Sequence, residues 1–471
     1  MSVILIRPNT PYSSHSGLVS VQYPINIGYL SAFLNQNSVN CRVRDFEVEK
    51  FNEDEFKSFV KAVNPKLIGF SCMTPHILNA AYLASIVKNN FPEIKTVVGG
   101  AHPSAIPEQT LREFPQFDVV VVGEGENTLL ELAQRLICSK EINDVVGIVF
   151  NDKGKISFNP PRMPIENLDK IPFPDRSFLP MRMYKKSHVS KGFSRSFLRV
   201  AEVTISRGCP YQCIYCASKA VHSCKIRFRG IENIIKEIEK LVDDFNVEHI
   251  SFLDDTISIR KDVLSAVCVY LRMKKITFDC FTRVDHVDND MIKLMAGSGC
   301  KKISFGIESG SQKILRLIKK GTTVSQVREA FRLCKKHRIA KIEGSFMIGA
   351  HPDEDREDIE LTRKLIFELR PDILAIFIAV PYPGTELNRM LKERKFLNYE
   401  NWDDFKLFLG NPSWKCCQVP NEELKQISRN IINKHYLNPA LLMNNFSGLR
   451  NIEELFYWLR LAFSYLKTRK L

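Results

Sequence analysis

Short apolar runs of strand-like composition alternate with helical patterns along this chain, and this alternation constrains its fold most strongly. In the first third we predict strands at Val3–Ile6, Asn40–Asp45, Lys66–Ser71, Lys95–Gly99 and Asp118–Gly123. Helical patterns follow at Ile25–Asn35, Glu53–Val63, His76–Asn89, Glu108–Phe114 and Glu126–Leu136. Because each helix returns the chain to the same edge, successive strands run parallel. We therefore predict an α/β fold that begins with a doubly wound parallel sheet covered on both faces.

The same alternation returns further along the chain. Strands are predicted at Val200–Ile205, His249–Leu253, Thr277–Thr282, Lys302–Ile307, Lys341–Ile348 and Ile373–Val380. Helices are predicted at Ile231–Asp243, Lys261–Met273, Asp288–Ala296, Val324–His337, Asp353–Leu369 and Gly384–Lys395. Such repeated units predict a full or partial barrel, whose active site lies at the carboxyl ends of its strands.

A chain of 471 residues is too long for one ordinary domain. We expect a sheet domain over residues 1–145, a linker over 146–199, a barrel over 200–396 and a mostly helical segment over 397–471. Within the linker, Val145–Asn159 has the pattern of a hairpin, and the proline-rich stretch that follows predicts an extended connector.

Three thiols lie at C-x3-C-x2-C spacing in Cys209, Cys213 and Cys216, directly after the first strand of the barrel. Gly208 and Pro210 bend the backbone so that three sulfurs can face one centre. Soft thiolates select iron–sulfur clusters, zinc or copper(I). The simpler alternatives are a zinc loop or three structural cysteines. A closed zinc site usually takes four ligands, and only Cys224 lies nearby. The spacing therefore favours a cluster.

This loop resembles the signature of the radical S-adenosylmethionine (SAM) enzymes, with an aromatic residue, Tyr215, before the last cysteine. The resemblance implies that Cys209, Cys213 and Cys216 hold a [4Fe–4S] cluster whose open iron binds SAM. Reduction would cleave SAM to methionine and a 5′-deoxyadenosyl radical. The six strand–helix units likewise match the partial (β/α)6 barrel of that family.

Polar side chains follow several strands of the predicted barrel, where SAM is expected to bind. Carboxylates there can accept from an ammonium or from ribose hydroxyls, and an arginine can bind a carboxylate with two hydrogen bonds. The resemblance suggests Asp254 or Asp255 near the amino group of SAM. It places the other SAM-binding candidates, Arg283, Glu308 and Ser309, near the carboxylate and ribose. Each can instead be a structural cap or ion pair. The sequence identifies no catalytic residue.

Polar and glycine-rich turns also follow three strands of the first sheet. Glycines let a backbone approach a ligand, and hydroxyls donate hydrogen bonds. As an ordered set these turns resemble the Rossmann-like cobalamin-binding domain of many radical SAM enzymes, through Pro24 to Leu30, Gly99 to His102 and Gly123 to Glu126. The cobalamin-binding candidates are Ser71, Thr74, Gly99, Gly100, Gly123, Glu124 and Gly125.

The first domain departs from one pattern of cobalamin proteins. Many of them place a histidine on cobalt through Asp-x-His-x-x-Gly, but the corresponding stretch, Asp45 to Glu49, contains no histidine. The lower axial site would then lack histidine; alternatively the domain has kept the fold and lost the cofactor. His76 and His102 lie near the expected ligand face, where we interpret them as turn or supporting residues.

Composition limits the setting of the protein. No apolar run reaches the ~18 residues of a membrane span, and the apolar start at Val3–Ile6 is too short for a secretory signal. The 13 cysteines are then typical of a reducing cytoplasm. A net charge of +14 permits anionic partners, but we expect the basic residues to be spread over solvated faces, without specific nucleic-acid binding.

The last segment contains two helical patterns, Glu422–Tyr436 and the amphipathic Ile452–Leu466. The second either docks on the barrel or contacts a membrane surface to reach a lipid or isoprenoid substrate. The adjacent Cys416 and Cys417 are interpreted as buried thiols rather than ligands.

Overall the chain resembles cobalamin-dependent radical SAM enzymes, most of them methyltransferases. The resemblance implies that one SAM methylates cobalamin and another yields the radical that activates an unactivated carbon of a small molecule. An electron donor such as flavodoxin or ferredoxin would be needed. The alternatives are cyclisation or rearrangement within the same family, a methylthiotransferase, and a non-catalytic metal- or cluster-binding module.

Overall fold

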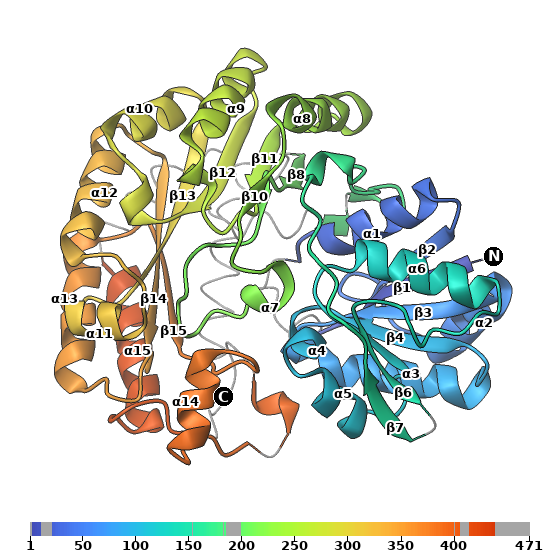
Figure 1. The fold of residues 1–471 in the computed structure, drawn as a ribbon. Coiled ribbons are helices and arrows are strands. Elements are labelled where there is room, and N and C mark those ends of the chain that lie inside the picture. The colour runs from blue at the N-terminus through green and yellow to red at the C-terminus, as the bar shows by residue number, and fades with distance from the viewer. Residues whose placement is uncertain are drawn as a thin grey trace.

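Two large sheets with surrounding helices, the first mostly parallel and the second fully parallel, dominate the fold (Figure 1), as seen in a computed structural model. The structure describes residues 2–10, 21–152, 154–181, 183–184, 199–399, 401–405 and 414–438. Within these ranges, no helix has both the length and the apolar character needed to cross a membrane. The predicted α/β class is confirmed.

The first sheet has seven strands in the order β2-β1-β3-β4-β5-β6-β7. Its first five strands are parallel, and their order makes the sheet doubly wound. The central strands are buried because helices cover both faces. The strands are β1 (Ser2–Arg7), β2 (Asn40–Asp45), β3 (Pro65–Ser71), β4 (Lys95–Gly99), β5 (Val119–Val121), β6 (Ile148–Asp152) and β7 (Lys155–Phe158). The helices are α1 (Ile25–Gln36), α2 (Glu53–Val63), α3 (Ile77–Asn90), α4 (Ala101–Ala105), α5 (Pro107–Glu113) and α6 (Glu126–Ile137).

The hairpin that we assigned to the linker extends the first sheet instead. Strand β6 pairs antiparallel with β5, with Val149 opposite Val120, and β7 completes the edge. Val149 and Phe150 are buried, so the hairpin contributes to the core of this unit. The proline-rich stretch beyond it packs back on α1, because Leu168 and Ile171 form a small apolar cluster with Tyr29.

The second sheet has six parallel strands in the order β15-β14-β13-β12-β11-β8. Among the described residues the first and last of these strands lie at opposite edges, so the sheet forms an open, partial barrel. The strands are β8 (Val200–Val203), β11 (His249–Phe252), β12 (Thr277–Thr282), β13 (Cys300–Glu308), β14 (Lys341–Ile348) and β15 (Ile373–Ile378). Helices lie on the outer side (Figure 1): α8 (Ile231–Phe245), α9 (Lys261–Met273), α10 (Asn289–Gly297), α12 (Val324–Lys336) and α13 (Arg356–Leu369).

Several short elements were not predicted, because they are too short to show a period. They are β9 (Ser206–Arg207), α7 (Lys219–His222), β10 (Arg227–Phe228) and α11 (Gln312–Leu317), besides α4. The chain continues with α14 (Glu386–Glu393) and α15 (Asn421–Tyr436). Helix α15 packs on β15, where the Tyr436 hydroxyl accepts from the Leu374 amide at 3.0 Å. The amphipathic pattern predicted at 452–466 lies outside the described residues.

Candidate functional site

The cysteine loop begins at β9 and is held by contacts to distant segments. Gly208 has a φ of +90°, and a Cβ atom there would lie 2.5 Å from the Lys225 carbonyl oxygen, so only glycine fits. Further along, the Ile214 amide donates to the Ile318 carbonyl at 3.2 Å, and the Ile214 carbonyl accepts from the Leu387 amide at 2.8 Å. These bonds fix the middle of the loop against the end of α11 and the start of α14.

Cys209, Cys213 and Cys216 are free thiols of the same short loop; Cys213 is buried and the other two are half-buried. Burial raises the pKa of Cys209, and burial raises that of Cys216 to about 11. Such thiols bind metal by releasing protons, which fits a cluster held by thiolates. Among the described residues no group of three His, Cys, Asp or Glu side chains could hold a single metal ion. A [4Fe–4S] cluster does not require such convergence, because each thiolate binds a different iron.

Asp254 follows β11 and supports the start of the cysteine loop. Its carboxylate accepts from the Ile205 amide at 3.0 Å and from the Ser206 hydroxyl at 2.5 Å. Burial raises the pKa of Asp254 to about 6. Asp255 is exposed and accepts from the Ser218 hydroxyl at 3.0 Å, just beyond Cys216. Both carboxylates therefore lie beside the loop, and their assignment to SAM stays a prediction.

We expect Asp254→Ala to lower the iron content of the protein. The change leaves the Ile205 amide and the Ser206 hydroxyl without their acceptor, at a cost of about 1–3 kcal/mol for each buried group. The loop then loses its fixed starting geometry. Iron per chain after anaerobic reconstitution measures this, with Asp255→Ala as the control that keeps its iron. Equal iron in the two variants would contradict the supporting role of Asp254.

Arg283 follows β12 and lies beside the loop with much of its guanidinium already engaged. Nε and Nη2 donate to Asp285 at 2.9 and 2.8 Å, and Nη2 also donates to the Lys320 carbonyl at 2.7 Å. The guanidinium carbon lies 3.6 Å from the centre of the Tyr211 ring, a cation–π contact. Tyr211 in turn forms a hydrogen bond with His286. The charge of Arg283 is therefore held in place next to the cysteines.

Glu308 ends β13 with a φ of +70°, a left-handed conformation that is uncommon outside glycine. Its carboxylate accepts from the buried Lys320 ammonium at 2.9 Å, and the same ammonium lies 3.3 Å from the Tyr215 hydroxyl. Lys320 was missed because nothing in the sequence around it distinguishes it from a surface lysine. Ser309 points elsewhere, since its hydroxyl bonds with that of Thr362 on α13 at 3.0 Å.

Glu354 lies beyond β14, in the turn before α13, and is fully buried. Its Oε2 accepts from the Ala350 amide at 2.6 Å, while Oε1 lies buried without a hydrogen bond. Burial raises the pKa of Glu354 to about 8. Between the ordinary carboxyl pKa of about 4.3 and pH 8, the folded protein therefore holds a proton on Glu354 that the unfolded chain releases. The contribution of this protonated carboxyl to the stability of the fold is complete below about pH 4.3 and is lost as the pH rises through 8.

We expect Glu354→Gln to remove this pH dependence. An amide copies the protonated carboxyl, so the variant should gain stability over the wild type by about 1.4 kcal/mol per pH unit between pH 5 and 8. Urea unfolding at three pH values in that range measures the gain. Glu93→Gln, which changes an exposed carboxylate, should leave the wild-type slope unchanged. A constant difference between Glu354→Gln and wild type would show that the carboxyl ionises normally.

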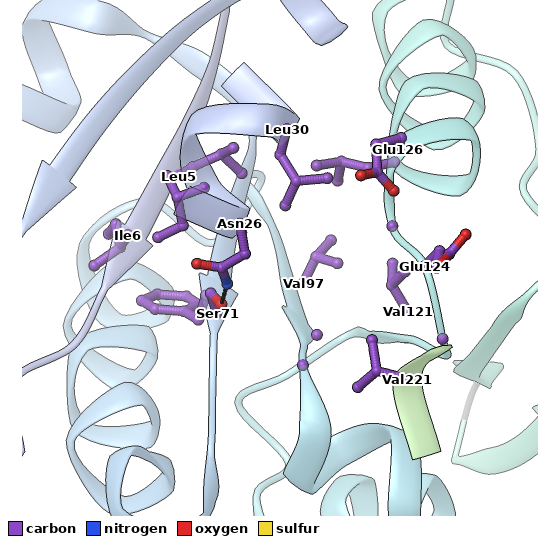
Figure 2. Close-up of a pocket in the computed structure, with 18 of the residues that line it drawn as sticks. Leu5, Ile6, Asn26, Leu30, Ser71, Val97, Val121, Glu124, Glu126 and Val221 are labelled. Atoms are coloured by element: carbon purple, nitrogen blue, oxygen red, sulfur yellow. Dashed lines mark hydrogen bonds between the residues drawn. The ribbon is translucent and has the colours of Figure 1, made fainter. Parts of the chain in front are cut away.

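A pocket that is partly open to solvent lies at the carboxyl edge of the first sheet (Figure 2). Its inner walls are the apolar side chains of Leu5, Leu30, Val97 and Val121. Its mouth is polar, and there the Asn26 amide donates to the Ser71 hydroxyl at 2.7 Å. Apolar walls with convergent polar groups at the mouth suit a flat, largely apolar ligand with polar substituents, which fits cobalamin.

Six of the seven cobalamin candidates line this pocket: Ser71, Gly99, Gly100, Gly123, Glu124 and Gly125. Thr74 is the exception, because its buried hydroxyl is 3.2 Å from Nδ1 of His102. His76 is also engaged elsewhere, with Glu47 at 3.4 Å, and neither histidine lines the pocket. Their interpretation as supporting residues agrees with these contacts.

The second domain completes the wall of the pocket with Arg207, Val221 and His222. Arg207 lies two residues before the first cysteine, and the other two belong to α7, just after the last one. The sequence analysis missed all three. The one feature of the sequence that points to these residues is their closeness to the cysteines along the chain. That closeness does not show that α7 packs on α4 of the first domain.

Comparisons with known proteins agree with this arrangement. Two family models match, the B12 binding domain over residues 18–133 and the Radical SAM superfamily over residues 203–366. An uncharacterized methyltransferase of Pyrococcus horikoshii is 31% identical over 449 residues, which is 94% of each chain. The anaerobic magnesium-protoporphyrin IX monomethyl ester cyclase of Rubrivivax gelatinosus is 27% identical and covers 95% of this chain and 79% of its own length.

The fold also matches solved structures. The cobalamin-dependent SAM radical enzyme OxsB, with aqua-cobalamin and SAM bound, superimposes with a TM-score of 0.72 at 18% identity. The match covers 99% of this chain and 71% of OxsB. The chain belongs to the radical SAM enzymes that carry a cobalamin-binding domain. Its cofactors are a [4Fe–4S] cluster, SAM and cobalamin.

Proposed function

We propose that the protein methylates an unactivated carbon of a small-molecule substrate. One observation carries the proposal: the pocket suited to cobalamin and the cysteine loop suited to the cluster adjoin, because Arg207 and His222 flank the cysteines and also line the pocket. When bound, the cluster with SAM supplies activation of a carbon–hydrogen bond, and cobalamin supplies a methyl group. The relative from Pyrococcus horikoshii, a methyltransferase by name, supports this proposal.

In this proposal the residues of the chain bind and orient the reactants. Cys209, Cys213 and Cys216 hold the cluster. The fixed charge of Arg283 and the Lys320–Glu308 pair bind polar groups of SAM beside it. The apolar walls of the pocket keep water away from cobalamin, which limits side reactions of a radical enzyme.

The organisation of the chain is part of the same proposal. We propose a cobalamin-binding unit over residues 1–145, whose sheet continues into the β6–β7 hairpin, and a radical SAM unit over 200–396. The electron donor is proposed to be a flavodoxin or ferredoxin in the cytoplasm, in keeping with the high cysteine content. The substrate is a small molecule, with a lipid or isoprenoid among the classes to test.

Cyclisation without methyl transfer is the second candidate, because the cyclase of Rubrivivax gelatinosus matches 95% of this chain. The test is anaerobic incubation of the reconstituted protein with SAM, hydroxocobalamin, a strong reductant and candidate substrates. Methylation should produce both S-adenosylhomocysteine and 5′-deoxyadenosine, since one SAM gives its methyl group and another is cleaved. Formation of 5′-deoxyadenosine without S-adenosylhomocysteine would favour cyclisation and refute methyl transfer.

A further inference from the structure

Glu124 lines the mouth of the pocket, yet its carboxylate is bound by side chains of the other domain. Arg227 on β10 donates to both oxygens, to Oε1 at 2.6 Å and to Oε2 at 2.9 Å. Nδ1 of His222 lies 3.1 Å from Oε1. The side chains of Glu124 and Arg227 are only 4% and 3% exposed. A bidentate pair at this depth is a strong and directional contact.

The pair belongs to a small network that reaches the cysteine loop. Strands β9 and β10 form a two-stranded antiparallel ribbon in which Arg207 is directly opposite Arg227. Like charges opposite each other destabilise a ribbon, so these arginines need compensation. Glu126 accepts from Arg207 at 2.6 Å, and Glu124 accepts from Arg227. Two carboxylates of the first domain thus neutralise the ribbon that leads to the first cysteine.

The same network fixes α7. His222 ends this helix, and Val221 beside it lies close to Gly123, where a Cβ atom would be 3.6 Å from the Val221 carbonyl oxygen. Helix α7 has a single turn and is too short to keep its position unaided. The bonds from Glu124 to His222 and Arg227 hold this turn over the mouth of the pocket.

We propose that Glu124 is an interdomain positioning residue, which retains cobalamin by holding Arg227 and His222 of the radical SAM domain across the mouth of the pocket. The proposal rests on cobalamin binding in the pocket and does not depend on methyl transfer. It predicts that Glu124 raises the affinity for cobalamin indirectly, through Arg227 and His222 of the other domain, although these two residues lie far along the chain from the cobalamin-binding motifs. A direct contact between Glu124 and the cofactor would behave differently in double variants.

The test is a titration of the anaerobically reconstituted full chain with hydroxocobalamin, followed by absorbance. Glu124→Gln and Arg227→Gln should each raise the Kd for hydroxocobalamin about tenfold. The Kd of the double variant should not exceed that of the weaker-binding single variant, because both changes remove the same contact. Additive losses, about a hundredfold in the double variant, would show that Glu124 touches the cofactor directly and would overturn the proposal.

Stability has to be separated from positioning, since each single change leaves a buried charge without its bidentate partner. The double variant removes both charges and should recover thermal stability relative to the single variants. Weak hydroxocobalamin binding by a double variant of wild-type stability supports the proposal. Recovery of affinity together with stability would mean a purely structural role and would refute it.

Three further changes complete the design. His222→Ala changes a partly exposed residue, and we expect a several-fold weaker affinity with an unchanged melting temperature; wild-type affinity would contradict the proposal. Arg328→Gln breaks an exposed bidentate pair with Glu368 on the outer helices and should leave the affinity unchanged.

Trp402→Phe removes an interdomain bond to Glu113 away from the pocket. Equal weakening by Trp402→Phe would indicate general domain docking and refute a specific role for Glu124.

Discussion

Cys213→Ala should reduce the iron content of the reconstituted protein from about four atoms per chain to background. Cys213 is the middle cysteine of the loop and is buried, and the backbone bonds of its neighbour Ile214 to Ile318 and Leu387 fix its position. A [4Fe–4S] cluster with three protein ligands does not persist when one is lost, because a further iron is then exposed. Iron and sulfide analysis together with the visible spectrum measure the loss.

The matched control is Cys224→Ala, the nearest additional thiol, which is exposed. This variant should keep its iron and its spectrum. Loss of metal from Cys224→Ala as well would indicate four ligands and a closed site of the zinc type. Full iron in Cys213→Ala would contradict the assignment of the cluster to this loop.

Gly100→Ala should abolish hydroxocobalamin retention and destabilise the first domain by several kcal/mol. Gly100 has a φ of +108°, and a Cβ atom would lie 2.5 Å from the Cys72 carbonyl oxygen and 3.0 Å from the Cys72 nitrogen. Those backbone atoms directly follow β3, and the Cys72 amide there donates to the Gly99 carbonyl at the end of β4 at 2.7 Å. An alanine therefore has to push the strand ends apart, directly beneath the pocket.

A second glycine separates the two causes of this effect. Gly154 also has a positive φ, +92°, but no atom lies within 4 Å of its Cβ position. Gly154→Ala therefore carries the backbone strain alone, about 1 kcal/mol, and should keep hydroxocobalamin binding. Melting temperature and cobalamin affinity measured on both variants test this. Equal effects at the two positions would show that close packing at Gly100 is not what shapes the pocket.

The order of strands and helices was predictable because it depends on local pattern. Buried parallel strands are continuous apolar runs and the helices between them have a regular period, so most boundaries agreed within two residues. The β6–β7 hairpin was recognised but placed in the linker. Its pairing with β5 depends on tertiary contacts that the hairpin sequence does not contain. The one-turn helix α7 shows no period, so its place at the pocket was not predictable either.

The site was predictable to the extent that motifs place residues at strand ends. The cysteine loop and the glycine turns are such motifs, and six of the seven cobalamin candidates do line one pocket. What the sequence does not show is the partner of each charge. Glu124 and Arg227 are 103 residues apart, and Lys320 reaches Glu308 only because α11 folds back between them. Ser309 sits beside a site residue in sequence, but strand alternation turns it to α13.

The most direct test of this account is the cofactor content of anaerobically purified protein after reconstitution with iron, sulfide and hydroxocobalamin. The adjoining pocket and cysteine loop predict about four irons and one tightly retained corrinoid per chain, both visible in the absorption spectrum. Iron without retained corrinoid would contradict the two-cofactor enzyme and remove methyl transfer through cobalamin. Zinc in place of iron would contradict the assignment of the cysteine loop itself.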